Sequence, residues 1–142
     1  MAVDKATEVA RELIRRAPNR RWLRELTDLL DREVRAEPLQ RIRSLWGLNN
    51  ANLGRIFGVT RQAVTSWFDD GVPVGRAETI ATIAAATDIL DRKLKRERIP
   101  AVVRRPSERL GGRSLLQLAE AGRHREVLEA VREIFDLRRV QP

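Results

Sequence analysis

Apolar residues recur every three to four positions along most of the chain, and this spacing is typical of amphipathic helices. Two such stripes come first, separated by Pro18 and Asn19. The stripes consist of Ala6, Val9, Ala10, Leu13 and Ile14, and of Trp22, Leu26, Leu29, Leu30 and Val34. Two amphipathic helices joined by a short turn predict an antiparallel helical hairpin.

The helical spacing continues beyond this hairpin, with proline and glycine at the expected boundaries. Pro38 is expected to begin a third helix, which ends at Gly47. Further helices are expected over residues 76–94, 100–105, 115–121 and 123–139. No segment shows sustained alternation of apolar and polar residues, so we expect essentially no sheet and an all-α fold.

The stretch "LGRIFGVTRQAVTSW", residues 53–67, has helical apolar spacing on both sides of Gly58. A helix–turn–helix needs a turn residue that adopts positive φ easily, and Gly58 supplies it. Gly54 supplies a small residue where the second helix crosses the first, and Asn49 and Thr60 stand where N-caps are needed. The shared core is expected to contain Leu53, Phe57, Val59, Val64 and Trp67.

The outward residues of the second helix then predict DNA contacts. A recognition helix presents its first residues to base edges in the major groove. Those residues are Arg61, Gln62, Thr65 and Ser66. Arginine can bond guanine through two hydrogen bonds and glutamine can bond adenine in the same way, while Thr60 and Arg55 are expected at phosphates. The alternative is a small three-helix unit whose polar surface contacts no DNA.

Charge supports a polyanionic partner. The chain carries 28 Lys and Arg against 20 Asp and Glu, a net charge of +8. A positive net charge favours binding to a polyanion such as double-stranded DNA. The alternative explanation is that the charged residues only solvate the helical surface. The N-terminus lacks the apolar centre of a signal peptide, and no stretch approaches the roughly 20 apolar residues of a membrane span. We therefore expect a cytoplasmic protein that associates with the nucleoid when it binds DNA.

Reactive side chains are too few for an enzyme. The chain contains no cysteine, no tyrosine and one histidine, His124, so it has no thiol nucleophile and no pair of histidine ligands. No glycine-rich phosphate loop follows a strand. We expect no catalytic residue, metal or cofactor, and we expect His124 on the solvated surface. The tryptophans at 22, 46 and 67 lie on apolar stripes and are expected in the core.

The C-terminal third, "IPAVVRRPSERLGGRSLLQLAEAGRHREVLEAVREIFD", resembles the C-terminal domain of the MbcA/ParS/Xre antitoxins. The parts that carry the resemblance are a short helix ending in proline, the segment "LGGRSLLQLAEAGR" and a final amphipathic helix. Those antitoxins have an Xre-like helix–turn–helix upstream, which residues 39–76 resemble. The resemblance covers roughly residues 39–138 and is strongest at 106–123.

This resemblance implies a partner, a RES-domain toxin that degrades or transfers NAD⁺. It also implies a homodimer that represses its own operon. The docking contacts would come from the loop at Arg109, Gly111, Gly112 and Arg113 and from the tail residues Arg138, Arg139, Gln141 and Pro142. The tail arginines and the terminal carboxylate would then mimic or oppose the charges of a dinucleotide in the toxin's pocket. Without the resemblance, the two glycines only turn the chain, and Leu115, Leu116 and Leu118 close a small core.

The sequence therefore predicts three parts. They are an N-terminal helical hairpin at residues 1–37, an Xre-like helix–turn–helix core with its following helix at 38–98, and a toxin-binding and dimerisation domain at 99–142. The resulting hypothesis is a DNA-binding antitoxin. The alternative is a stand-alone dimeric regulator of the Xre type without a toxin partner.

Overall fold

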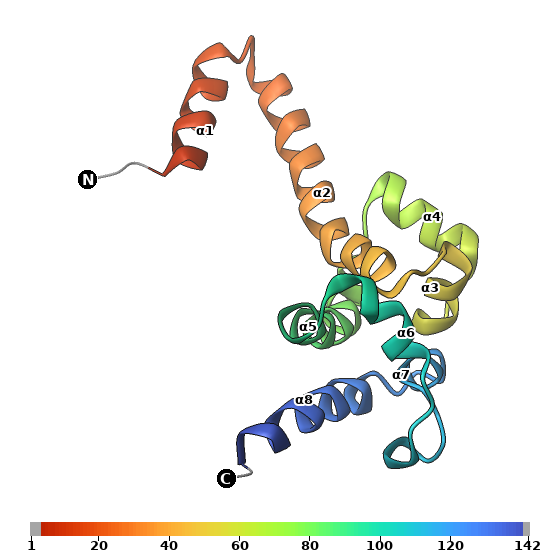
Figure 1. Ribbon diagram of the computed structural model, residues 1–142. Helices are drawn as coiled ribbons and strands as arrows, with labels where there is room; N and C mark the ends of the chain where they lie inside the picture. Colours follow the sequence, from red (N-terminus) through yellow and green to blue (C-terminus); the bar gives the residue numbers. More distant parts are fainter. Residues whose placement is uncertain (1–3, 141–142) are drawn as a thin grey trace. The chain divides into compact units, whose positions relative to one another are not determined.

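The computed structural model describes residues 4–140, with side chains up to residue 136 (Figure 1). Over this range the chain forms eight α-helices and three short 3-10 helices and contains no strand, which confirms the predicted all-α class. The α-helices are α1 (Lys5–Arg16), α2 (Arg20–Trp46), α3 (Asn50–Phe57), α4 (Arg61–Asp70), α5 (Ala77–Lys93), α6 (Ile99–Arg104), α7 (Leu115–Glu120) and α8 (His124–Val140). The 3-10 helices are η1 (Val74–Arg76), η2 (Arg96–Arg98) and η3 (Glu108–Leu110).

The chain divides into two compact units, residues 1–34 and residues 35–142. This division falls inside α2, close to the boundary expected at residue 37. The segment expected to form its own domain from residue 99 onward lies in the same unit as the residues before it. The reason is that α8 packs against α5, and α7 packs against α3.

The expectation that Pro38 begins a new helix is wrong, because α2 runs through it. Proline removes one backbone hydrogen bond, here the bond from position 38 to the Val34 carbonyl, and a proline inside a helix costs about 3 kcal/mol. The helix continues because Leu39 and Ile42, which follow Pro38, are fully buried. Burying side chains of this size contributes about 1.5–3 kcal/mol each, which offsets the proline.

The core of the second unit forms around Trp46, which is fully buried. Its indole Nε1 donates a hydrogen bond to Thr87 Oγ1 at 3.0 Å, and that hydroxyl donates to the Ile83 carbonyl at 2.8 Å. Trp67 is also buried, so both tryptophans lie in the core as predicted. The first unit has no comparable core: Trp22 is only half-buried, and none of residues 4–34 is buried.

A cluster of charges joins α2 to the end of α5. Arg41 forms ion pairs with Asp88 and Asp91, and Arg96 donates two hydrogen bonds to Asp91 at 2.9 and 3.2 Å. The hydrogen bonds and charge of Arg96, with a further contribution from Arg41, hold the pKa of Asp91 below its ordinary value of 3.8. Partial burial acts in the opposite direction but does not outweigh them. The same contacts raise the pKa of Arg96.

Candidate nucleic-acid interface

Helices α3 and α4 are joined by the turn Gly58-Val59-Thr60. Gly58 ends α3 with a φ of +68°, in the left-handed region that strains residues with a Cβ. The Val59 amide donates a hydrogen bond to the Gly54 carbonyl at 2.8 Å and closes the end of the helix. The turn therefore has the glycine conformation that the sequence predicts.

Gly54 has the second predicted role, that of a small residue at a close approach. A Cβ at this position would lie 2.6 Å from the Val59 carbonyl oxygen and 3.3 Å from the Thr60 carbonyl carbon. The optimal separation of nonbonded carbon atoms is about 3.5–4.0 Å, so the first of these distances is a clash with backbone. Glycine at position 54 therefore allows the turn and the start of α4 to lie against α3.

Both predicted N-caps are confirmed. The Asn49 side chain accepts a hydrogen bond from the Asn52 amide at 2.8 Å, and the Asn52 side chain accepts one from the Asn49 amide at 3.1 Å. Thr60 Oγ1 accepts a hydrogen bond from the Ala63 amide at 3.1 Å. These bonds satisfy amides that the first turn of a helix otherwise leaves unpaired, and they fix where α3 and α4 begin.

The inner faces of α3 and α4 share one apolar cluster. Leu53 and Val64 are fully buried, and the rings of Phe57 and Trp67 are tilted by 56° with their centroids 6.4 Å apart. These side chains belong to the same core cluster as Trp46. The orientation of α4 is therefore set by the core of the whole second unit.

The outer face of α4 is polar and exposed, and it carries Arg61, Gln62, Thr65 and Ser66. Within the described part of the chain, the side chains of Arg61 and Gln62 make no hydrogen bond or ion pair. Thr65 Oγ1 donates to the Arg61 carbonyl at 3.1 Å, and Ser66 Oγ donates to the Asp70 carboxylate at 3.2 Å. The first turn of α4 thus presents a guanidinium and an amide to solvent, directly after a fixed cap.

Sequence reasoning misses two residues beside α4, Arg43 and Asn50. Asn50 Nδ2 donates a hydrogen bond to Thr65 Oγ1 at 3.2 Å, and Asn50 Oδ1 accepts one from Arg43 Nη1 at 2.9 Å. The Arg43 guanidinium lies 4.0 Å from the centre of the Phe68 ring, within cation–π range. No local pattern signals these contacts, because the four residues belong to three different helices. Their effect is to hold a cation of α2 next to α4.

The two residues predicted to hold phosphates, Thr60 and Arg55, are both exposed. Arg55 lies on α3, and its Nε is 3.5 Å from a carboxylate oxygen of Glu120 on α7. Exposed pairs of this kind contribute little free energy, and 56% of the Arg55 side chain faces solvent. Arg55 therefore already has an anionic partner, but one that a phosphate can replace.

The expectation that His124 is a solvated surface residue is wrong. His124 is partly buried at the start of α8, and its Nε2 lies 2.6 Å from the Ile56 carbonyl oxygen. Because a carbonyl only accepts, the ring donates this hydrogen bond. The His124 ring also contacts the Phe57 ring, with centroids 5.7 Å apart. The C-terminal segment is thus attached to the end of α3.

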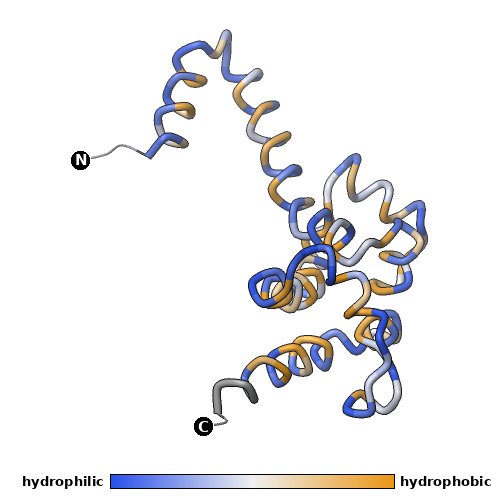
Figure 2. The backbone as a smooth tube through the Cα atoms, viewed as in Figure 1, coloured by the Kyte–Doolittle hydropathy of each residue, from blue (hydrophilic) through white to orange (hydrophobic). Residues whose placement is uncertain are grey.

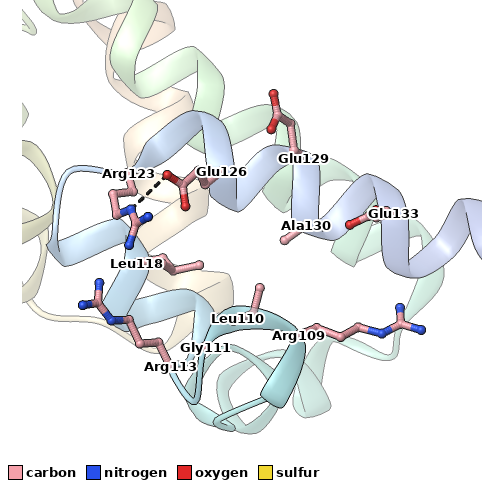
Figure 3. A pocket seen from close by; sticks show the side chains of 10 residues that line it. All are labelled: Arg109, Leu110, Gly111, Arg113, Leu118, Arg123, Glu126, Glu129, Ala130 and Glu133. Carbon is pink, nitrogen blue, oxygen red and sulfur yellow. Dashed lines mark hydrogen bonds and ion pairs between the residues drawn. The ribbon is translucent and has the colours of Figure 1, made fainter.

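A second polar surface lies at the C-terminal loop, where a hollow of about 510 Å³ lies between this loop, α7 and α8. Figure 3 shows the side chains that line it. Arginines line the side of the loop and α7, and glutamates line the side of α8. These residues are Arg109, Arg113 and Arg123, and Glu126, Glu129 and Glu133. Arg123 and Glu126 form an ion pair at 2.9 Å. The hollow therefore offers charges of both signs, of which several remain exposed.

The predicted docking loop forms one rim of this hollow. Gly111 and Gly112 have φ values of +68° and +80°, and a Cβ at either would meet no atom within 4 Å. Both lie in an exposed turn between Arg109 and Arg113, as expected. The glycines are therefore required by the conformation of the turn and not by crowding.

The predicted tail contacts cannot be placed in this hollow. Arg138 and Arg139 belong to α8, but their side chains lie outside the described residues, as do Gln141 and Pro142. The helix reaches Val140, so the expected tail is helical over most of its length.

No family model, curated protein or solved structure matches this chain. Among the described residues, no group of three or more potential ligand side chains is placed to hold a metal ion. No described helix is both long enough and apolar enough to cross a membrane.

Proposed function

We propose that this protein binds double-stranded DNA by placing α4 in the major groove, with α3 and α4 acting as a helix–turn–helix. The observation that carries the proposal is the first turn of α4. There Arg61 and Gln62 are exposed and without a partner in the described chain, while the cap at Thr60 fixes the helix that bears them. Long polar side chains on a rigid support suit the reading of base edges.

The residue types in this turn match the donors and acceptors of base pairs. Arg61 can donate two hydrogen bonds to guanine, and Gln62 can exchange two with adenine. Thr60, the N-cap of α4, and Arg55, on α3, suit phosphate oxygens, which position the protein without reading sequence. Residues 39–76 contain five basic and two acidic residues, so this part of the unit attracts a polyanion.

The experiment is selection of duplexes from a random DNA pool with the full chain, followed by binding measurements on the selected site. Arg61→Ala should weaken binding to that site by about 1–3 kcal/mol and relax the preference at one base position. Arg61→Lys keeps the charge but loses the bidentate geometry, so it should lose specificity and retain nonspecific affinity. Arg55→Ala should weaken binding to all sequences by similar factors.

Arg98→Ala is the matched control, since Arg98 is an exposed arginine of η2 outside the α3–α4 pair. It removes the same charge and should leave the base preference intact. Unchanged specificity in both Arg61 variants would refute the placement of α4 in the groove.

We propose further that the protein acts as an antitoxin, in which the C-terminal hollow docks a RES-domain toxin that consumes NAD⁺. This part rests on the sequence resemblance, together with the exposed arginines and glutamates that line the hollow. A protein that binds its own operator and its toxin would repress its own operon. A stand-alone regulator remains the second candidate, which the exposed α4 surface supports by itself.

Where a RES-domain protein is encoded beside this gene, two variants test the docking surface in cells that express both proteins. Arg109→Glu with Arg113→Glu reverses two exposed charges at the rim, and deletion of residues 137–142 removes the predicted tail. Each should reduce protection, scored by growth and by NAD⁺ level, and leave DNA affinity unchanged. Arg98→Glu is the control and should protect fully. Full protection by both docking variants would refute docking at this surface, and a neighbouring gene that encodes no RES domain would favour the stand-alone regulator.

A further inference from the structure

The first unit exposes the apolar faces of both its helices. None of residues 4–34 is buried, and the exposed fractions are 51% for Val9, 61% for Ile14, 48% for Leu29, 51% for Leu30 and 71% for Val34. Figure 2 shows apolar positions recurring along α1 and along the first part of α2. The full sets of apolar positions, 6, 9, 10, 13 and 14 in α1 and 22, 26, 29, 30 and 34 in α2, follow helical spacing, so each helix carries a continuous apolar stripe.

A unit of this size does not stabilise itself by burial. Below about 40 residues, independent folding usually requires disulfides, a metal or oligomerisation. The chain has no cysteine, and no group of metal-binding side chains occurs among the described residues. Oligomerisation is the remaining route to cover these stripes.

The distribution of charge indicates which partner covers them. Residues 13–24, at the turn between α1 and α2, contain five arginines and no acidic residue. The opposite end of the unit, formed by residues 4–12 and by residues 25–34 of α2, contains seven acidic and three basic residues. The unit is therefore positive at its turn and negative at its open end. A second copy in inverted orientation places each positive turn beside a negative open end.

The ion pairs at the border between the two charged regions do not remove this polarity. Arg15 and Arg16 pair with Glu12, and Arg21 pairs with Glu25. These pairs are exposed and lie at the border between the two charged regions, and exposed pairs of this kind contribute little free energy. Along the unit, like charges of α1 and α2 share the same end, so one chain alone cannot bring opposite ends together.

We infer that residues 4–34 form a homodimerisation element, in which two copies pair with opposite orientation into an antiparallel four-helix bundle. The two apolar stripes of each copy form the interior of this bundle, the usual arrangement of amphipathic helices of similar length. A two-fold axis makes the two contacts between the turn of one copy and the open end of the other equivalent. The inference goes beyond the proposed function and assigns dimerisation to residues 4–34 instead of 99–142.

Electrostatic repulsion disfavours a pairing with both turns at the same end, and it disfavours a polyanion as the partner of this unit. A pairing with both turns at the same end would bring two sets of five arginines together. A polyanion such as DNA would be attracted by the turn but repelled by the open end, and the unit as a whole carries eight basic and seven acidic residues. A second copy matches both ends and the apolar stripes at once.

The test is sedimentation of the full chain without DNA, over a range of protein concentrations. The wild-type protein should be a dimer. Ile14→Asp with Leu30→Asp places charges in the proposed interior and should raise the dissociation constant by about a hundredfold or more. Val74→Asp is the matched control: Val74 is an apolar residue of the second unit with 78% exposure, and this variant should remain dimeric. A monomeric wild type, or a dimer unaffected by the Ile14 and Leu30 changes, would overturn the inference.

Charge reversals test the orientation without touching the apolar stripes. Arg20→Glu with Arg24→Glu alters the turn, and Asp28→Arg with Glu33→Arg alters the open end. In the inverted arrangement each variant dimerises more weakly than the wild type, and a mixture of the two forms heterodimers tighter than either homodimer. With both turns at the same end, each variant would dimerise more tightly than the wild type, and this result would overturn the inverted bundle. Far-UV circular dichroism establishes that the variants remain helical.

Discussion

Replacing Gly58 by alanine isolates the conformational requirement of the turn between α3 and α4. Gly58 has φ +68° and ψ 34°, and a Cβ there meets no atom within 4 Å. The substitution therefore adds no clash, and its whole effect comes from holding alanine in the left-handed region. That conformation costs roughly 1–2 kcal/mol for a residue with a Cβ. We expect Gly58→Ala to lower the free energy of unfolding of the second unit by about this amount.

The measurement is urea unfolding followed by circular dichroism, with Gly75→Ala as the control. Gly75 lies in η1, has no positive φ, and has no atom within 4 Å of an added Cβ. Alanine there should be neutral or stabilise by about 0.4–1 kcal/mol, because it restricts the unfolded chain. If Gly58→Ala is as stable as Gly75→Ala, the assignment of a left-handed conformation to Gly58 is wrong, and so is the orientation of α4 that depends on this turn.

Three further predictions concern other positions. Gly54→Ala should give a net loss of up to about 2 kcal/mol in the same assay, because about 1–3 kcal/mol of overpacking exceeds the roughly 1 kcal/mol gained in helix propensity; a more stable variant would refute the close approach. Asp91→Asn should lower the melting temperature at pH 7, and the difference should shrink as the pH falls from 3.8 through the lowered pKa of Asp91, because this lowered pKa adds stability only while the carboxylate is ionised; a difference as large at pH 2 as at pH 7 would contradict this. Trp46→Phe should cost about 1–2 kcal/mol through its lost hydrogen bond to Thr87, and Thr87→Val should cost much less in the Trp46→Phe background than alone.

The α3–α4 turn was predictable from sequence because its determinants are local. A glycine at positive φ, a small residue four positions earlier and two capping side chains all act within one turn of helix. Gly58, Gly54, Asn49 and Thr60 occupy in the structure the roles that their spacing predicts. Local rules of this kind depend on backbone geometry alone, so they hold without knowledge of the tertiary fold.

The features that sequence reasoning misses depend on tertiary contacts. Pro38 normally marks a helix boundary, but burial of Leu39 and Ile42 on the following turns keeps α2 continuous. His124 stands among charged residues at a helix start, and only the packing of α8 beside α3 gives it a carbonyl partner. Arg43 reaches Asn50 across the turn at Gly47. Periodicity along one helix carries no information about which helix lies opposite.

These tertiary contacts also limit how far the two proposed surfaces can be separated. The last turn of α3 leaves carbonyl groups that need donors, and three different parts of the chain supply them. The Val59 amide bonds the Gly54 carbonyl, Arg76 Nη1 bonds the Phe57 carbonyl at 3.1 Å, and His124 bonds the Ile56 carbonyl. One of these donors comes from the segment that we propose docks a toxin. Variants at the exposed rim and tail can therefore separate toxin binding from DNA binding. Removal of the whole segment from residue 99 would instead remove the hydrogen bond from His124 to the end of α3, and with it one of the contacts that fix the orientation of α4.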